Sequence, residues 1–188
     1  MKTIPFKTNP RPGLPDPDVL LRLMVRDITK IRHRRLRNPA LHVVLYEPEI
    51  PANTGNIARL CAAAEVRLHL IHPLGFRVDD RHLKRAGLDY WEEVDIRHHD
   101  GFQDFLAYSG GNGKLVAFSR HAAQDYVRAD IAHGDYLLFG KETLGLPEEI
   151  QNTYPCYGIP MWGKVRSLNL STAVGIVVYH YLHSMGRF

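Results

Sequence analysis

Three polar segments of the chain could carry chemistry, because each gathers charged and hydrogen-bonding side chains where a short apolar run ends. The segments span residues 53–59, 139–146 and 159–171. Their Asn, Ser, Glu and Arg side chains supply both donors and acceptors. Their glycines would let a ligand approach the backbone closely. Together these segments suggest the rim of a polar binding site.

The first segment places Asn56 and Arg59 one helical turn apart, so that both side chains can point the same way. Asn53 is expected to cap that helix. A helix N-terminus attracts negative charge, and Arg59 beside it would make this corner favourable for an anion. A capping role alone would explain Asn53 but not Arg59.

The other two segments combine turn residues with groups that could face a ligand. Gly140 and Gly145 enclose Glu142, although an ordinary turn needs only one glycine. The pair therefore indicates positive φ or a close ligand approach. In the third segment Ser167 is expected to cap the last helix and to place Asn169 in its first turn. This pattern suggests a ligand edge as well as a cap.

Apolar runs and helical patterns alternate along residues 39–188. Strands are expected at residues 41–46, 66–71, 114–118, 136–139 and 157–161, and helices at 54–64, near 79–87, at 101–108, from Pro147 onward and at 168–184. Such alternation is typical of an α/β domain, in which helices flank a mostly parallel sheet.

Residues 1–38 are expected to form a basic N-terminal extension ahead of this domain. They carry ten Lys and Arg against three Asp, a balance of +7, whereas residues 39–188 carry fourteen against seventeen acidic residues, a balance of −3. A helix is expected over about 19–37. Its basic cluster, which includes Lys30, Arg34 and Arg35, is expected to bind a polyanion such as RNA. A solvated basic helix is the alternative.

The composition argues against several other classes of protein. The 188 residues suit one domain, and no apolar run approaches the ~18 residues of a membrane span. No secretory signal is expected, and Cys61 and Cys156 are too few for a disulfide framework, so we expect a cytoplasmic protein. No metal site is expected, because the histidines, among them His98 and His99 in an expected loop, lack a metal-binding motif.

Taken in order, the three segments resemble the motifs of the SPOUT-superfamily RNA 2′-O-ribose methyltransferases. Those motifs read Asn-x-Gly-Asn-x-x-Arg, Phe-Gly-x-Glu-x-x-Gly-Leu, and Ile-Pro-Met followed by Ser-x-Asn-x-Ser, and each stands here in full. Residues 45–51 and 85–90 are similar to a narrower group, the small bacterial tRNA (cytidine/uridine-34-2′-O)-methyltransferases. The resemblance covers residues 41–181 and departs at His180, where the family usually has Glu.

This resemblance implies an α/β fold whose C-terminal part threads into a trefoil knot. It implies S-adenosyl-L-methionine as the cofactor and no metal. The methyl acceptor would be a ribose 2′-hydroxyl of tRNA, at the wobble nucleotide. Cofactor contacts would come from Phe118, Gly140, Ile159, Met161, Ser167 and Leu168.

The resemblance also implies catalytic roles. Arg59 would stabilise the developing alkoxide rather than remove the proton, because free arginine stays protonated. Hydrogen bonds from Asn53, Asn56, Glu142, Ser167 and Asn169 would complete the site. The family forms homodimers, so Tyr179 and the apolar last helix would face RNA or a partner subunit, and Arg59 would also contact RNA. Two alternatives stay open: methylation of rRNA by the same site, and an RNA-binding protein that kept the fold without catalysis.

Overall fold

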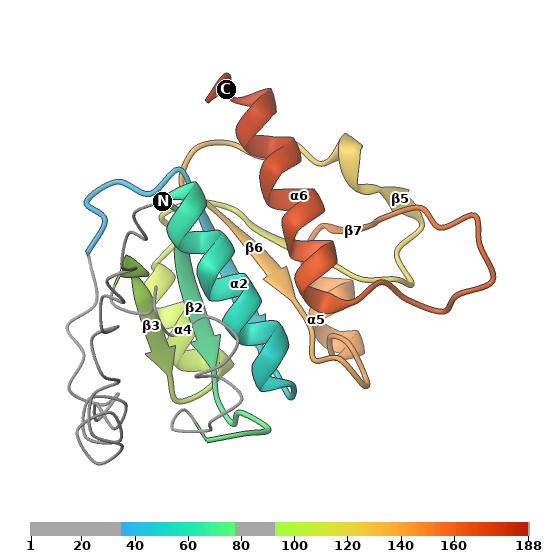
Figure 1. Ribbon diagram of the computed structural model, residues 1–188, viewed down its shortest axis with the longest axis horizontal. Helices are drawn as coiled ribbons and strands as arrows, with labels where there is room; N and C mark the ends of the chain where they lie inside the picture. The colour runs from blue at the N-terminus through green and yellow to red at the C-terminus, as the bar shows by residue number, and fades with distance from the viewer. Residues whose placement is uncertain (1–34, 78–92, 188) are drawn as a thin grey trace, which may run out of the picture. The chain divides into compact units, whose positions relative to one another are not determined.

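A seven-stranded parallel sheet forms the centre of the protein (Figure 1). A computed structural model describes residues 35–77 and 93–187. The strand order is β3-β2-β1-β6-β4-β7-β5, and every described pair is parallel. The strands are β1 (Leu41–Tyr46), β2 (Arg67–Ile71), β3 (Ile96–His99), β4 (Leu115–Phe118), β5 (Gln124–Asp125), β6 (Asp135–Phe139) and β7 (Cys156–Gly158).

Helices cover both faces of this sheet, as an all-parallel sheet requires. They are α2 (Pro51–Ala64), α4 (Phe102–Ser109), the short 3₁₀ helix η3 (Tyr126–Arg128), α5 (Glu148–Thr153) and α6 (Leu170–Ser184). Figure 1 shows α2 and α6 side by side over one face, with α4 and α5 behind the sheet. On the α4 side, Phe105 and Ile150 pack with Val44 and Leu138 in one buried cluster. No helix in the described part of the chain is long and apolar enough to cross a membrane.

The α/β architecture predicted from the sequence is confirmed, although some local predictions are wrong. Asn53 does not cap α2, which begins two residues earlier at Pro51 after Ile50. Proline suits the first turn of a helix because its missing N–H would have no partner there. Ser167 does not cap α6 either. That role belongs to Asn169, whose side chain accepts from the backbone N–H of Ser171 at 2.9 Å.

One strand was missed, and several predictions concern residues outside the described part of the chain. His98 and His99 lie on β3 rather than in a loop, because their polar side chains hide the strand from a search for apolar runs. The helix expected near residues 79–87 and the basic residues Lys30 and Arg34 lie outside the described residues. The trefoil knot stays a prediction.

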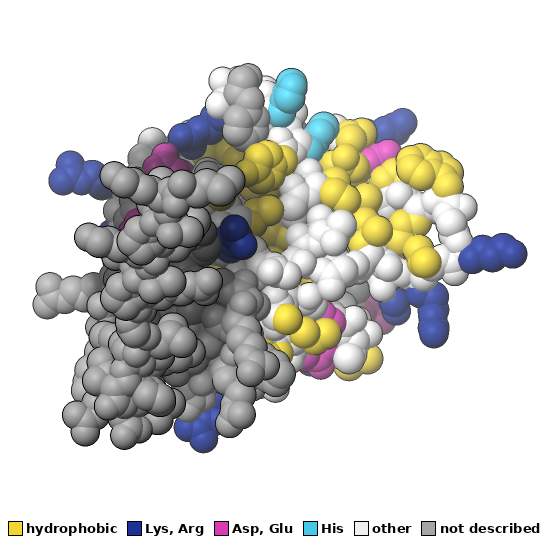
Figure 2. All heavy atoms as spheres, viewed as in Figure 1, with side chains coloured by type: hydrophobic (Ala, Val, Ile, Leu, Met, Phe, Trp, Pro, Cys, Tyr) yellow, Lys and Arg dark blue, Asp and Glu magenta, His cyan; other side chains and the backbone are white. Residues whose placement is uncertain are grey.

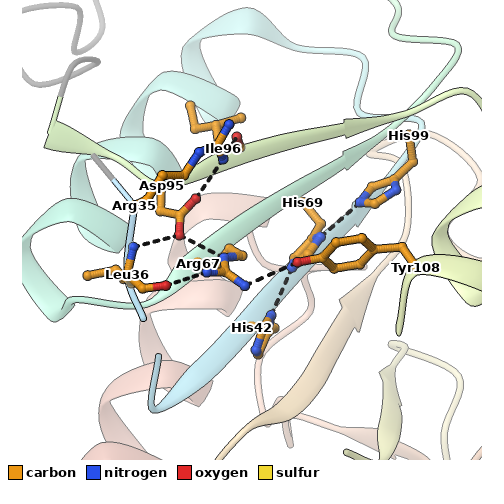
Figure 3. Close-up of polar contacts among 9 residues, drawn as sticks. All are labelled: Arg35, Leu36, His42, Arg67, His69, Asp95, Ile96, His99 and Tyr108. Carbon is orange, nitrogen blue, oxygen red and sulfur yellow. Dashed lines mark hydrogen bonds and ion pairs between the residues drawn. The ribbon is translucent and has the colours of Figure 1, made fainter. Parts of the chain in front are cut away.

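A buried carboxylate holds the start of the described chain against the sheet (Figure 3). Asp95 accepts from Arg67 Nε at 2.7 Å and from Arg35 Nη1 at 2.9 Å. It also accepts from the backbone N–H of Leu36 at 2.9 Å, and Arg67 donates to the Leu36 carbonyl. Burial alone would raise the pKa of Asp95, but these hydrogen bonds outweigh it and hold the pKa below its usual value.

Three buried histidines cross the same face of the sheet in a hydrogen-bonded row (Figure 3). His42 Nδ1 lies 2.9 Å from His69 Nε2, and His69 Nδ1 lies 2.9 Å from His99 Nε2. His99 Nδ1 lies 3.3 Å from a carboxylate oxygen of Asp104. An ionised carboxylate can only accept, so His99 Nδ1 donates to it, and each preceding ring then donates through Nδ1 to the next.

The surroundings of this row favour the neutral form of all three imidazoles. Burial, with Arg67 nearby, lowers the pKa of His42 to about 4. Burial also lowers the pKa of His69 well below its usual value, and that of His99 to a lesser degree against the attraction of Asp104. Arg97, whose guanidinium lies 4.8 Å from the centre of the Tyr108 ring, adds positive charge beside the row.

We expect stability to fall as the pH drops below about 6.5. The unfolded chain takes up protons there, whereas the folded histidines stay neutral until the pH nears the depressed value of about 4 for His42. Each such histidine should cost roughly 1.4 kcal/mol per pH unit. Urea unfolding between pH 7.5 and 5 measures this slope.

His69→Gln, which keeps a donor and an acceptor, should make the slope shallower. The exposed His183→Gln, which changes a histidine outside the row, serves as the matched control for this substitution. A wild-type stability that is constant over this range would contradict the prediction. Asp95 does not affect this measurement. Its pKa is depressed, so its protonation lowers the free energy of unfolding only at a much lower pH.

Candidate active site

A cavity of about 310 Å³ opens where several strands end. Parallel strands present their carboxyl ends at one edge of the sheet, and ligands of open α/β sheets bind in that crevice. The cavity is lined by residues that follow β1, β4, β6 and β7 and by the start of α6. They are Ile50, Asn53, Phe118, Ser119, Arg120, His121, Phe139, Gly140, Lys141, Glu142, Thr143, Gly145, Tyr157, Ile159, Met161, Ser167, Leu168, Asn169, Leu170 and Ala173.

All six residues predicted to contact a cofactor lie in this lining: Phe118, Gly140, Ile159, Met161, Ser167 and Leu168. They come from the ends of β4, β6 and β7 and from the connection to α6. The Phe118 and Phe139 rings stack with centroids 5.0 Å apart, which gives the cavity an aromatic wall. The cavity therefore joins an apolar interior to polar groups at its edge, as small-molecule sites commonly do.

Glu142 ties two of the loops that form the cavity. One carboxylate oxygen accepts from the backbone N–H of Glu49 at 2.7 Å. The other accepts from Asn53 Nδ2 at 2.9 Å and from the backbone N–H of Ile50 at 3.3 Å. Both oxygens are thus occupied by donors from the β1–α2 connection. Glu142 acts here as a brace between loops.

The brace continues into a third loop through two asparagines. Asn53 uses its amide nitrogen on Glu142, which leaves its Oδ1 to accept from Asn169 Nδ2 at 2.8 Å. Asn169 in turn uses its Oδ1 to cap α6, accepting from Ser171. Because the carboxylate only accepts, the orientation of both amides follows from it. We call this Glu142–Asn53–Asn169 chain the amide relay.

Further contacts fasten the same two loops. Lys141 Nζ pairs with a carboxylate oxygen of Glu47 at 2.8 Å. Thr143 donates its backbone N–H and its hydroxyl to Glu49 at 2.9 Å. These hydrogen bonds hold the pKa of Glu49 below its usual value. The loops after β1 and β6 are therefore joined by three carboxylates.

The two glycines of this loop are explained by the loop itself. A Cβ on Gly140 would lie 2.2 Å from backbone atoms of Gly145 and Leu146, so no larger residue fits there. Gly145 has φ +72°, which glycine adopts without strain, and its N–H donates to the Lys141 carbonyl at 2.9 Å. The interpretation that the pair indicates a close ligand approach is therefore unnecessary, although both residues line the cavity.

Arg59 and Asn56 lie apart from the cavity lining of the described residues. Both are exposed on α2, several residues beyond the buried Asn53. Tyr179 is 43% exposed on α6. Arg35, expected among the RNA-contacting cations, is half-exposed and pairs with Asp95. The structure thus gathers Glu142 and Asn169 with the six expected cofactor contacts, which include Ser167, but not Arg59 or Asn56.

The cysteines do not supply a nucleophile to this site. Burial raises the pKa of Cys61 far above its usual value and raises that of Cys156 as well. Low-pKa thiolates are the reactive form, so both residues act as packing side chains. Within the described ranges, no three His, Cys, Asp or Glu side chains converge as metal ligands would.

The turn after β4 and the residues that fasten the loops were not predicted from the sequence. Ser119, Arg120 and His121 line the cavity, as do Lys141 and Thr143. No motif marks the β4 turn. Its position directly after an expected strand was the available signal, because parallel strands end at the same edge of the sheet.

Comparisons with known proteins agree with this architecture. A Yersinia pestis protein named "tRNA (cytidine(34)-2′-O)-methyltransferase" is 47% identical over 153 residues, which are 78% of this chain and 94% of that protein. A solved structure described as "Structural insights into the 2-OH methylation of C/U34 on tRNA" is 51% identical, with a TM-score of 0.75 over 78% of this chain and 97% of its own.

A more distant structure shares the fold alone. It is an AdoMet-bound rRNA methyltransferase from Sinorhizobium meliloti, 22% identical with a TM-score of 0.72 over 90% of this chain and 70% of its own. At the family level, residues 40–179 match the SpoU rRNA Methylase family. This match spans the sheet, the amide relay and the cavity, and the chain belongs to the SpoU methylase family.

Proposed function

We propose that the protein transfers a methyl group from S-adenosyl-L-methionine to a ribose 2′-hydroxyl of tRNA, at the wobble nucleotide (position 34, cytidine or uridine). The observation that carries this proposal is the cavity at the carboxyl edge, lined by every residue expected to contact the cofactor. The name of the Yersinia pestis relative supports the same reaction and the same nucleotide.

The cavity fits an adenosyl group. Phe118, Ile159, Met161 and Leu168 give apolar walls for a flat base, and Ser167 offers a hydroxyl. Its volume of about 310 Å³ lies at the lower end of the range for small-molecule sites. When bound, the cofactor supplies a sulfonium methyl group as the electrophile, so the reaction needs no metal.

The residues of this chain then have to bind the acceptor and stabilise its charge. A 2′-hydroxyl passes its proton to water as it attacks, and a nearby positive charge stabilises the negative charge that develops on its oxygen. Arg59 is the residue that we assign to this role, and Asn56, Ser167 and Asn169 would orient the ribose by hydrogen bonding. Glu142 has both oxygens occupied by donors, so we assign it to positioning rather than to proton transfer.

Because Arg59 and Asn56 lie outside the cavity lining, a homodimer is part of the proposal. Figure 2 shows exposed hydrophobic side chains on the part of the surface formed by α6, β5 and β7. Lys and Arg side chains lie at the edge of this region. Tyr179 and Val127 are 43% and 49% exposed. Such a surface could pack against a second copy and bring the Arg59 of one subunit close to the cavity of the other.

The tRNA substrate is favoured over rRNA, although the family name refers to rRNA. The relatives near 50% identity carry tRNA names, whereas the Sinorhizobium meliloti rRNA methyltransferase is only 22% identical. The basic extension of residues 1–38, with Lys30 and Arg34, would add phosphate contacts. A cytoplasmic location and the trefoil knot complete the proposal. The competing function is an RNA-binding protein without catalysis.

Leu168→Ala should weaken binding of S-adenosylhomocysteine, the product form of the cofactor, by about tenfold. The change removes apolar contact from the cavity wall, and roughly 1.4 kcal/mol corresponds to that factor. Leu144→Ala is the matched control, because Leu144 is 76% exposed and lies outside the lining. Calorimetry measures both affinities, and equal affinities would contradict the assignment of the cavity.

The amide relay predicts that two damaging changes compensate each other. Glu142→Gln removes a charge that three N–H donors share, and Asn53→Asp places a carboxylate against Glu142. Each should cost about 2 kcal/mol of unfolding free energy. In the double variant the introduced glutamine amide can donate to the introduced carboxylate, which still accepts from Asn169.

We therefore expect the double variant to be more stable than the sum of the single effects, by at least about 1 kcal/mol. Urea unfolding of all four proteins gives this coupling. Strict additivity would show that the relay does not join the loops. The exposed Asn56→Asp provides a control for an amide-to-carboxylate change on the same helix.

The proposed reaction is tested by methyl transfer from labelled S-adenosylmethionine to unmodified tRNA, followed by mapping of the 2′-O-methyl group. Wild-type protein should label position 34. Arg59→Ala should lower turnover by ~10²–10³, the usual effect of losing one electrostatic stabiliser, and should leave S-adenosylhomocysteine affinity nearly unchanged.

Arg128→Ala, another exposed arginine, should keep turnover within a few-fold. Arg59→Lys separates a point charge from directed hydrogen bonds, because lysine lacks the planar guanidinium. Cofactor binding without methyl transfer to any RNA would support the non-catalytic alternative. A label found on rRNA and not on tRNA would show that rRNA, rather than tRNA, is the substrate.

A further inference from the structure

One cation at the cavity is not neutralised by a described carboxylate. Lys141 lines the cavity but pairs with Glu47 at 2.8 Å. Arg120 also lines it, and its side-chain partner is the imidazole of His121, which accepts from Arg120 Nε at 3.0 Å. An imidazole that accepts this hydrogen bond is neutral, so the charge of Arg120 stays uncompensated by it.

The turn that carries Arg120 is held firmly against the sheet. The backbone N–H of Ser119 donates to the Tyr157 carbonyl at 3.0 Å, and the N–H of Ala122 donates to the Ser119 carbonyl at 3.2 Å. The Ser119 hydroxyl accepts from the backbone N–H of His121 at 3.2 Å. The turn packs so closely on β7 that a Cβ on Gly158 would lie 3.0 Å from the Ser119 carbonyl oxygen.

The hydrogen bond to His121 also orients the guanidinium. It uses the Nε–H and leaves the two terminal nitrogens, with four N–H donors, for another partner. A guanidinium so placed presents the planar fork that binds carboxylate or phosphate with two hydrogen bonds. The acidic groups of the loops, Glu47, Glu49 and Glu142, would otherwise repel an anion at this cavity.

We propose that Arg120 binds an anionic oxygen group at the mouth of the cavity, with His121 as its positioning residue. This inference rests on the proposed function, which offers two such groups. One is the α-carboxylate of the cofactor's methionyl part, and the other is a phosphate that flanks the methylated ribose. Both lie close to the methyl group that is transferred, and Arg120 follows Phe118, an expected cofactor contact, by two residues.

Arg120→Ala separates the two sources when its binding is measured with three probes. If Arg120 binds the carboxylate, affinity for S-adenosylhomocysteine should fall at least tenfold. Affinity for methylthioadenosine, which lacks the amino-acid part, should not change. If Arg120 binds phosphate, both affinities should be unchanged, tRNA binding should weaken, and the logarithmic salt slope should fall by ~0.7–0.9.

Arg128→Ala, on η3 and outside the cavity lining, is the matched control. Unchanged binding of all three probes would overturn the inference. So would an equal loss for S-adenosylhomocysteine and methylthioadenosine, because that result would indicate damage to the cavity rather than a lost anion contact. Arg120→Lys should recover part of the affinity, since it keeps the charge without the fork.

The positioning role of His121 is tested by a pair of variants. His121→Leu should reproduce part of the Arg120→Ala defect, and His121→Gln, which keeps an acceptor, should restore most of the affinity. Equal affinities of the two variants would show that His121 does not position Arg120. Methyl transfer by the wild-type protein tests the proposed function separately. If it occurs while Arg120→Ala binds every probe normally, this inference alone fails.

Discussion

The cavity depends on one carboxylate that can only accept hydrogen bonds. Glu142 receives donors from Glu49, Ile50 and Asn53, and so joins the end of β6 to the end of β1. Because this carboxylate only accepts, it fixes the orientation of the Asn53 amide. Asn53 in turn fixes the orientation of the Asn169 amide at the start of α6. Hydrogen bonds that begin at the Glu142 carboxylate thus connect three loops from separate parts of the chain. Each of these loop ends satisfies a polar group of another loop.

The opposite, β2–β3 part of the sheet is held by a different kind of contact. Asp95 collects Arg35, Arg67 and the Leu36 backbone, and the row of His42, His69 and His99 crosses three strands beside it. Apart from the half-exposed Arg35, these polar groups are buried, and all are paired with one another, which is the condition under which they favour a single arrangement over others. This half of the sheet is therefore held by polar contacts separate from those that join the loops at the carboxyl edge.

The sequence predicted the parallel α/β sheet because its buried strands are short apolar runs with helical patterns between them. It could not predict β3, since Arg97, His98 and His99 interrupt the apolar pattern and are placed by pairing with the neighbouring strand β2. The cavity-lining residues were predicted through motif order, but their physical roles were not. Asn53 looks like a helix cap in sequence and proves to bridge two loops, which only the tertiary structure can reveal.

The same distinction separates the residues that build the site from those that would make it an enzyme. Gly140, Gly145, Asn53 and Glu142 are each required by contacts within the protein. A binding protein that kept this fold would need them as much as a methyltransferase would. Their presence therefore supports the architecture without deciding the chemistry. That decision rests on the catalytic role assigned to Arg59, whereas Arg120, held by His121 and paired with no carboxylate of the described residues, would bind an anionic group at the mouth of the cavity.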